Sequence, residues 1–500
     1  MAQTLSTEPM AVPGRPAGAS GNRWLVLVIV SLAQFMVVLD TTIVNVALPS
    51  IQRGLRFSAS DLQWVINAYL LFFGGFLLLG GRAGDLVGRK RMFLAGVLTF
   101  SLGSLINGVA PSATVLVVGR ALQGLGGAML SPAALSTITT TFADSRERTR
   151  ALGVWSGIAA GSGAIGLLLG GILTDALSWR WIFFINLPVG LMAVLAALRF
   201  VPESRGQALH RTFDFAGATS VTAGLVVLTY TLVNAQAWGW GSGRTVGLFA
   251  ASLALLLAFG LIEARSRSPL IRLSIFRIRA LAVADVSFFL TASGLFAMFY
   301  FTSLYVQDVL GYSPRKSGLA LLPLTAGIIA GAGAAQRLMR WLGVRLVASG
   351  GLAIAAVGMV LLTGISVNSS YVSDFLPGLV VLSTGMGLTF VPITLLATSG
   401  VQSQDAGLAS GLFNTMSQVG GALGLAILSS VAASRTATIL SGRGQNTPYA
   451  HLTALVSGFQ VAYVAAAVLL ACAAIAMLVL LRRRDVLALA DATPSTDVAA

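Results

Sequence analysis

Long apolar runs repeat along the whole chain, and short segments that carry most of the charges separate them. A membrane-spanning helix needs about 20 mostly apolar residues. Of the 500 residues, 56% are hydrophobic and only 10% are charged, whereas soluble domains carry about 25% charged residues. The sequence therefore predicts an all-α integral membrane protein with fourteen spans, at residues 24–49, 61–80, 91–110, 113–141, 149–174, 180–200, 215–235, 245–263, 280–304, 317–339, 345–366, 372–398, 406–432 and 455–481.

The basic residues alternate between the two sides that this count defines. If the N-terminus lies inside, 23 of the 32 Lys and Arg residues fall in inside segments, 8 fall in outside segments, and Arg120 falls within a helix. Cytoplasmic loops carry an excess of Lys and Arg. The bias predicts a cell-membrane protein with both termini in the cytoplasm, and the Arg-rich, Ala/Gly/Val-rich composition indicates a bacterial source.

A weak internal repeat suggests how the chain is divided. GDLVGRKRMFLAG at 84–96 and MRWLGVRLVASGG at 339–351 each place a basic, glycine-containing turn between two apolar runs on the inside. Paired six-helix halves with such a repeat are typical of secondary transporters. We expect a disordered cytoplasmic N-terminus, a six-helix half, two inserted spans with linkers, a second six-helix half and a cytoplasmic tail, at 1–23, 24–204, 205–275, 276–481 and 482–500.

Three charged residues lie five or more residues inside a predicted span. In VVLDTTIVNVALP, Asp40 precedes Pro49 by nine residues, about 13 Å along a helix at 1.5 Å per residue. Arg120 lies seven residues into its own run, about 10 Å deep on the same basis. Intramembrane charges are costly and usually face a partner or a cavity. Asp40 and Arg120 could be a purely structural pair, or Asp40 could bind a proton or a cationic substrate; Arg120 could also reach the interface. Asp285 is either a second embedded acid or an interfacial residue.

The loop GRAGDLVGRKR combines small residues with charges. Its glycines permit a tight turn, and its carboxylate can pair with the basic side chains that follow. Such a pair could form in one state of a transporter and part in another, as a conformational latch; an ordinary charged loop is the alternative. The residues concerned are Gly81, Asp85, Gly88, Arg89 and Lys90.

The run GVWSGIAAGSGAIGLLLGG is rich in glycine. It includes GSGAIG, but a dinucleotide site would need a preceding strand in a soluble βαβ unit, so we reject that interpretation. Small residues four apart allow two membrane helices to approach closely. We expect helix packing here, either with or without a hinge role, through Gly157, Gly161, Gly166, Gly170 and Gly171.

Several function classes are excluded. The single cysteine, Cys472, and the two histidines, His210 and His451, form no metal-binding pattern. No nucleophile–base pair or phosphate-binding loop is evident, so we expect neither an enzyme nor a cofactor. The positive charge is spread among short loops on one side, which argues against nucleic acid as a partner.

These motifs together resemble the major facilitator superfamily, and the span count resembles its fourteen-helix drug:proton antiporter branch. The loop motif at 81–90 matches, with Ala83 in place of the usual leucine. Arg120, Gln123 and Gly124 match a motif that the family links to proton coupling. LDTTIVNVALP and SWRWIFFINLPVG are similar to signatures of the branch. In the family's antiporter motif a proline follows Gly166, where this chain has Leu167.

The resemblance implies a major facilitator fold and proton-coupled export of lipophilic or cationic drug-like compounds by alternating access. The expected partners are a small-molecule substrate, protons and the lipid bilayer. In that role Asp40 would bind the proton or the cationic group, and Arg120 would tune it. A dedicated exporter of a metabolite, lipid precursor or peptide shares the same motifs, as does a uniporter or importer, which Leu167 favours.

Overall fold

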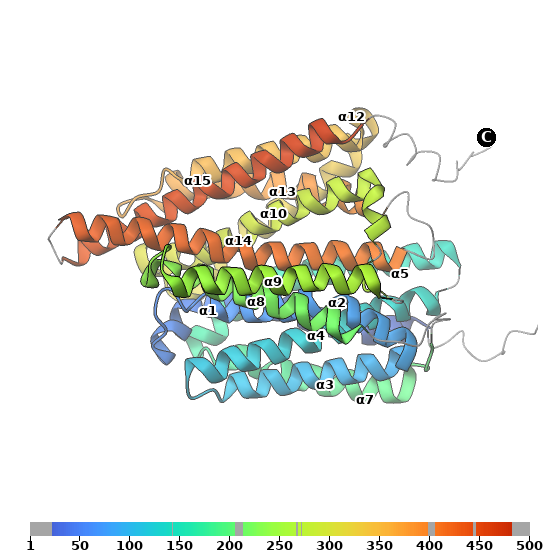
Figure 1. The fold of residues 1–500 in the computed structure, drawn as a ribbon. Coiled ribbons are helices and arrows are strands. Elements are labelled where there is room, and N and C mark those ends of the chain that lie inside the picture. Colours follow the sequence, from blue (N-terminus) through green and yellow to red (C-terminus); the bar gives the residue numbers. More distant parts are fainter. Residues whose placement is uncertain are drawn as a thin grey trace, which may run out of the picture.

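The structure is a computed structural model, and it describes residues 23–142, 144–205, 214–266, 269–271, 273–398, 406–443 and 447–482. Long helices run roughly side by side through one bundle (Figure 1). In the described residues, 13 helices are long and apolar enough to cross a membrane. One of them, Pro314–Leu362, contains Gly343 in a non-helical conformation and is therefore two spans. Counting it as two gives the fourteen spans that the sequence predicts.

The first group of helices packs around α4. Both α2 and α3 contact α4, and α1 contacts α5. Glycines bring α3 and α4 close together, because a Cβ atom on Gly126 would lie 2.5 Å from the backbone nitrogen of Phe100. The helices are α1 (Arg23–Leu55), α2 (Trp64–Val87), α3 (Arg89–Gly108), α4 (Ala113–Thr141), α5 (Ser145–Ala176), α6 (Trp181–Phe184) and α7 (Asn186–Phe200).

Two helices then form a hairpin on the outside of the bundle. They are α8 (Phe215–Trp238) and α9 (Gly243–Arg265), which pack against each other. Of the two, α8 also contacts α2 and α14, which are far apart in the sequence. The hairpin therefore covers a seam between the first and the last helices of the chain.

The last group packs around α12 and α14. The main contacts join α12 to α13 and α15, and α14 to α10 and α15. Short helical turns separate some of the long helices. The elements are η1 (Leu273–Arg277), α10 (Arg279–Leu304), η2 (Tyr305–Val309), α11 (Pro314–Ala320), α12 (Leu322–Leu362), η3 (Tyr371–Phe375), α13 (Leu376–Thr398), α14 (Ala406–Arg443) and α15 (Pro448–Leu480).

The two glycine turns of the internal repeat have the same backbone character. Gly88 separates α2 from α3 with φ 125°, and Gly343 breaks α12 with φ 78°. Positive φ is readily adopted by glycine because it lacks a Cβ atom. The repeat at 84–96 and 339–351 thus corresponds to two equivalent helix–turn–helix units.

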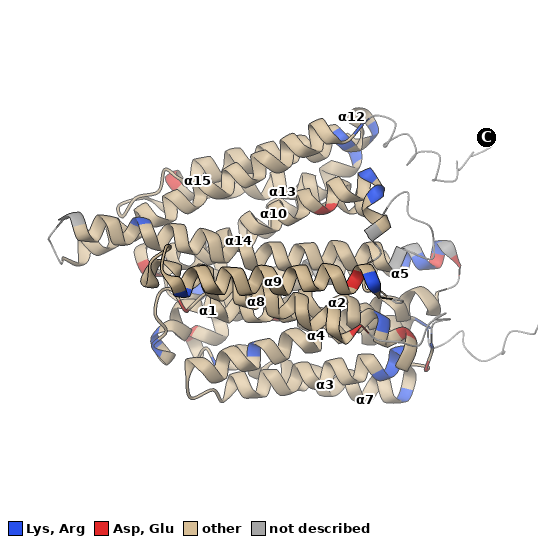
Figure 2. Cartoon of the chain, viewed as in Figure 1, with Lys and Arg blue, Asp and Glu red and all other residues tan. Residues whose placement is uncertain are grey.

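Charged residues gather at the two ends of the bundle, and most Lys and Arg residues lie at one of them (Figure 2). That end holds the start of α1 and the end of α15 (Figure 1). An ion pair there joins Arg23 to Glu147, with Nη1 and Oε2 2.7 Å apart. We refer to it as the basic end of the bundle.

Four predicted boundaries were wrong by six residues or more. The second span ends at Val87 and not at residue 80, and the last begins at Pro448 and not at residue 455. The first span continues through Pro49 to Leu55, because a proline inside a membrane helix is tolerated where neighbouring helices and local adjustments satisfy the freed backbone groups. Asp40 therefore lies fifteen residues before the helix end, about 22 Å along it rather than 13 Å. The span predicted at 406–432 continues to Arg443. The predicted disordered N-terminus and tail fall outside the described residues, apart from Arg23 and Arg482.

Candidate functional site

A buried ion pair joins α1 to α4. Nη1 of Arg120 donates to Oδ2 of Asp40, and the two residues are 1% and 0% exposed. The structure therefore brings together the two intramembrane charges that the sequence singled out in the first half of the chain. Burial of either charge alone would be strongly unfavourable, so each stabilises the other's charged form.

Amide and hydroxyl groups complete the surroundings of the carboxylate. Oδ1 of Asp40 accepts from Nε2 of Gln123 at 2.9 Å and from Nδ2 of Asn186 at 3.0 Å. Both amides also donate to Oγ of Ser104, at 2.7 and 3.2 Å. Asn107 donates to Oε1 of Gln123 at 2.6 Å. All of these side chains are buried, and they come from α1, α3, α4 and α7.

The guanidinium group of Arg120 is also held on its other sides. Its Nε donates to the carbonyl of Val65 at 2.8 Å, and its Nη1 donates to Oε1 of Gln123 at 2.9 Å. Its Cζ lies 4.5 Å from the centre of the Tyr69 ring, where an arginine cation is attracted to the ring face. Arg120 is thus fixed by α2 and α4 together, and it points at Asp40 instead of reaching the membrane interface.

This network can respond to a proton. An ionised Asp40 accepts three hydrogen bonds, and charge-assisted bonds of this kind are about twice as strong as neutral ones. Protonation of Asp40 would cancel the charge that holds Arg120 and would leave that cation buried without a counter-ion. The gain or loss of one proton would therefore rearrange contacts among α1, α2, α4 and α7.

Sequence reasoning missed four members of the network: Tyr69, Ser104, Asn107 and Asn186. A signal was present for the two asparagines, because each interrupts an apolar run. Helix rotation decides whether such a residue faces the network, and the sequence alone does not give that rotation.

The loop motif is tied to the end of α7. Nη2 of Arg89 lies 3.0 Å from Oδ1 of Asp85. Lys90 does not pair with that carboxylate; its Nζ donates to the carbonyl of Leu198, and its backbone N–H donates to Oε1 of Glu203. Gly81 packs against Pro132 of α4. These contacts of Gly81, Asp85, Arg89 and Lys90 lie within the first group of helices.

The glycines of α5 divide into two sets. A Cβ atom on Gly166 would meet Leu39 and Thr42 of α1, and one on Gly170 would meet Ile43. Gly171 lies against the backbone of Pro314 and Arg315 instead. These three are packing positions, as the spacing suggests.

The packing prediction for Gly157 and Gly161 was wrong for this structure. Among the described residues, no atom lies within 4 Å of a Cβ atom built at either position or at Gly153. Their part of α5 lies towards the basic end of the bundle, where this side of the helix has no described neighbour.

At the opposite end of the bundle the first and last helix groups are in contact. Nε2 of Gln307 donates to the carbonyl of Val46 at 2.7 Å. Leu167, at the position where the resemblance implies a proline, is buried with Val46 and Leu321 in an apolar cluster. Arg53 and Asp308 approach to 3.5 Å nearby. We call this set, which joins α1 and α5 to η2 and Leu321, the α1–η2 contact.

Asp285 lies in the second turn of α10 and is fully buried. It belongs to the last helix group, and its carboxyl oxygens accept no hydrogen bond from the Asp40 network or any other described residue. The embedded-acid alternative therefore describes its position better than the interfacial one.

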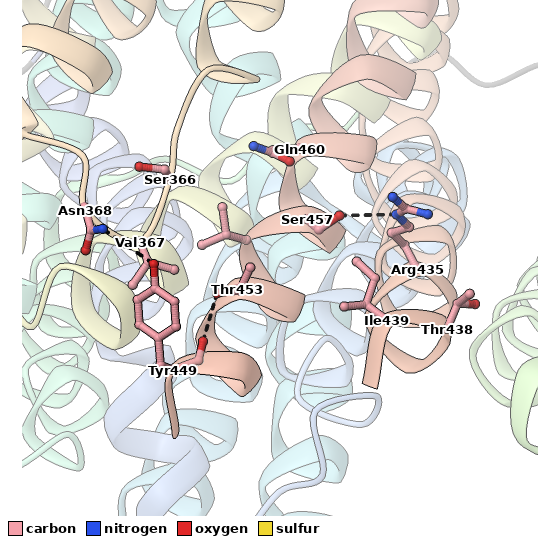
Figure 3. A pocket seen from close by; sticks show the side chains of 11 residues that line it. Ser366, Val367, Asn368, Arg435, Thr438, Ile439, Tyr449, Thr453, Ser457 and Gln460 are labelled. Carbon is pink, nitrogen blue, oxygen red and sulfur yellow. Dashed lines mark hydrogen bonds between the residues drawn. The ribbon is translucent and has the colours of Figure 1, made fainter. Parts of the chain in front are cut away.

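The structure also contains a pocket of about 530 Å³ between the ends of α14 and α15. Arg435 donates to Ser457 across it at 3.2 Å, and Tyr449 and Asn368 line its other side (Figure 3). None of the residues that line this pocket belongs to the Asp40 network. It is a separate feature of the last helix group.

Fourteen spans, a repeated glycine turn and a buried ion pair at the core of one helix group define a multi-pass membrane transporter. The family model of the Major Facilitator Superfamily matches residues 30–425. The chain belongs to the major facilitator superfamily.

Curated relatives agree with this assignment. The chain is 40% identical to "Puromycin resistance protein pur8" of Streptomyces alboniger, over 98% of this chain and 97% of that one. It is also 40% identical to "Cephamycin export protein CmcT" of Amycolatopsis lactamdurans, over 82% of this chain and 85% of that one. Against "Tetracenomycin C resistance and export protein" of Streptomyces glaucescens it is 36% identical, over 88% and 81%.

Solved structures share the fold. A bacterial homologue of the human lysosomal transporter Spinster, in an inward-facing and unoccupied conformation, aligns with a TM-score of 0.63 at 18% identity. The alignment covers 94% of this chain and 98% of that one. The predicted all-α major facilitator fold is thereby confirmed.

Proposed function

We propose that this protein exports lipophilic or cationic drug-like compounds across the bacterial cell membrane in exchange for protons. The relatives whose names refer to resistance and export support the direction and the type of substrate. The observation that carries the proposal is the buried Asp40–Arg120 pair, which a single proton would disrupt.

The contacts between the two helix groups support alternating access. At the end opposite the basic end they meet at the α1–η2 contact, and α2 packs against α14 along the seam. At the basic end α5 has no described neighbour around Gly157 and Gly161. We propose that the protein is open there, on the α5 side, and closed at the other end. We propose that the closed end faces outside, since the basic end carries most of the Lys and Arg residues. Both termini then lie in the cytoplasm.

We further propose that residues 24–204 and 276–481 are the two halves that rock, with 205–275 as an inserted pair. Packing within each helix group supports this division, as does the position of the α8–α9 hairpin at the periphery of the bundle. The Asp85–Arg89 pair, with Gly81, Gly88 and Lys90, would act as a latch that fixes the loop in one state. Gly166, Gly170 and Gly171 would form the surface on which α5 moves against α1 and α11.

Vesicle transport tests the coupling. Purified protein is reconstituted into liposomes, and uptake of ethidium, a lipophilic cation, is followed after a pH gradient that is acidic inside the liposomes is imposed, so that protons leave as ethidium enters. We expect gradient-driven uptake that a proton uncoupler abolishes, and a loss of at least tenfold in Asp40→Asn. Equal gradient-driven uptake by Asp40→Asn and the unchanged protein would overturn the assignment of Asp40.

A second candidate function is export of one dedicated metabolite. The relatives named for a single compound, such as cephamycin or tetracenomycin C, favour it. A panel of toxic compounds, tested in an efflux-deficient host with and without an uncoupler, separates the two. Protection against several unrelated compounds supports the drug exporter, and protection against one or none supports the dedicated exporter.

A further inference from the structure

Asp285 is a buried acid without a partner. It is 0% exposed, and neither carboxyl oxygen has a hydrogen-bond partner among the described residues. No ion pair between described residues includes it. An isolated ionised carboxylate in apolar surroundings is so costly that such groups are found neutral instead.

The surroundings of Asp285 are the apolar contact between α10 and α14. Leu281, one turn before it, packs with Ala409 and Leu412 of α14. Phe288, three residues after it, stacks on Phe413 with ring centres 4.1 Å apart. Residues three and four apart share one face of a helix, so Asp285 lies on the face of α10 that contacts α14. Apolar contacts cover that face on both sides of the carboxyl group.

The charged groups that could compensate an ionised Asp285 are few. α13 carries no titratable side chain between Leu376 and Thr398, and α14 carries none between Ala406 and Ser434. Arg279, one and a half turns earlier on α10, donates to the carbonyl of Leu480 through its Nε. The remaining titratable side chains on elements packed against α10 are Arg23, Asp40, Arg53, Arg277, Tyr305, Asp308, Arg435, Arg443, Tyr449, His451, Tyr463 and Cys472.

Among the described residues, none of these groups makes a hydrogen bond or an ion pair with Asp285. Several are engaged elsewhere. Asp40 pairs with Arg120, Arg53 with Asp308, and the hydroxyl of Tyr463 with Thr302. The electrostatic setting of Asp285 therefore opposes ionisation while α10 and α14 stay in contact.

We propose that Asp285 is a second proton-binding carboxyl group, which carries its proton while α10 and α14 are in contact and releases it when that contact opens. On release the O–H bond of the carboxyl group breaks, the proton passes to water, and the negative charge stays on the carboxylate. Because α10 begins at the basic end of the bundle and Asp285 lies in its second turn, water would reach the group from that end once the contact opens. The bound proton on Asp285 does not depend on the transport function. Its release during a transport cycle rests on the function proposed above.

The two acids would then have complementary chemistry. Arg120, Gln123 and Asn186 donate to Asp40 and offset the cost of a buried negative charge. No described residue donates to the carboxyl oxygens of Asp285, so we infer a bound proton there. A cycle that opens the α10–α14 contact would add a proton site in the last helix group to the one in the first.

Infrared spectroscopy tests the bound proton directly. Full-length protein in lipid nanodiscs is compared at neutral pH with two variants, Asp285→Asn and Asp40→Asn. Protonated carboxyl groups give a C=O stretching band that carboxylates lack. We expect this band in the unchanged protein, a loss of its buried component in Asp285→Asn, and its retention in Asp40→Asn. An unchanged band in Asp285→Asn would show that Asp285 is ionised and would overturn the proposal.

Proton counting tests the release. A pH-indicator dye records the protons set free when ethidium is added to the solubilised protein. We expect Asp285→Asn to release about one proton fewer than the unchanged protein. Equal release from both would overturn the release step. Failure of the proposed antiport would be a different result. Neither the unchanged protein nor Asp285→Asn would then take up ethidium in response to a pH gradient, but the buried infrared band would still be present in the unchanged protein and absent from Asp285→Asn.

Discussion

Two acids, Asp40 and Asp285, lie fully buried in helices that the sequence predicts to cross the membrane, yet their surroundings are opposite. Oxygens of Asp40 accept from Arg120, Gln123 and Asn186. Those of Asp285 accept from no described residue. Burial makes either charge costly, and the donors around the group decide whether that cost is offset. The same side chain can therefore be an anion at one site and a neutral acid at the other.

The comparison also shows why a transporter can use both. A paired acid changes its contacts when it gains a proton, and an unpaired one changes its contacts when it loses a proton. Because Asp40 and Asp285 respond to a proton in opposite ways, a single proton gradient could change the contacts of both helix groups. The predictions that follow are designed to break this contrast.

The largest effect is expected from Arg120→Met. This change leaves the Asp40 carboxylate buried without its cation, and removal of one partner of a buried pair costs about 3–5 kcal/mol. We expect a much lower thermal unfolding midpoint in detergent and no pH-driven ethidium uptake. The double variant Asp40→Asn/Arg120→Met removes both charges and should recover most of the stability but not the coupling.

Arg53→Met is the matched control. Arg53 also pairs with an aspartate, Asp308, but its side chain is 64% exposed and the atoms are 3.5 Å apart. Exposed pairs contribute about 0–1 kcal/mol, so its unfolding midpoint should change little. If the double variant were as unstable as Arg120→Met alone, the Asp40 charge would not be the cause of the loss.

A second pair of variants compares the acids directly. Asp40→Asn leaves the buried Arg120 cation without a counter-ion and should lose about 3 kcal/mol or more. Asp285→Asn exchanges one neutral group for another of the same shape and should stay within about 1 kcal/mol of the unchanged protein. Unfolding of both variants in parallel measures the difference. Equal losses would mean that Asp285 has a partner that stabilises it as an anion.

The sequence was sufficient for the architecture because hydrophobic runs and loop charges report directly on a membrane fold. Fourteen spans and the equivalent turns at Gly88 and Gly343 could be predicted from the chain alone. Helix ends were harder to predict. Pro49 was taken as the end of the first span, but the helix continues to Leu55, because lipid and neighbouring helices tolerate a proline that would end a helix in water.

The site could be predicted only in part, for a physical reason. Asp40 and Arg120 stand out because charge is rare in lipid, so the sequence marks them. Ser104, Asn107 and Asn186 are ordinary polar residues, and only the rotation of α3 and α7 brings them to Asp40. The same limit explains Gly157 and Gly161, whose spacing fits helix packing but whose side of α5 has no described neighbour.

The smallest effect on stability is expected from Ser104→Ala on α3. Ser104 and Ser101 lie one turn apart, and one hydroxyl has hydrogen-bond partners while the other has none among the described residues, so the pair repeats the contrast between the two acids. Ser104 accepts from the amides of Gln123 and Asn186, so Ser104→Ala removes an acceptor from both. The expected cost is about 1 kcal/mol. The hydroxyl of Ser101 is buried without a hydrogen-bond partner among the described residues.

Ser101→Ala is therefore the matched control, and it should leave the unfolding midpoint unchanged or raise it, because no hydrogen bond is lost and one unsatisfied group is removed. The amides of Gln123 and Asn186 also hold Asp40, so Ser104→Ala should shift the pH dependence of ethidium uptake while Ser101→Ala does not. If both variants shifted it alike, the effect would come from the packing of α3, and Ser104 would have no part in positioning the carboxylate.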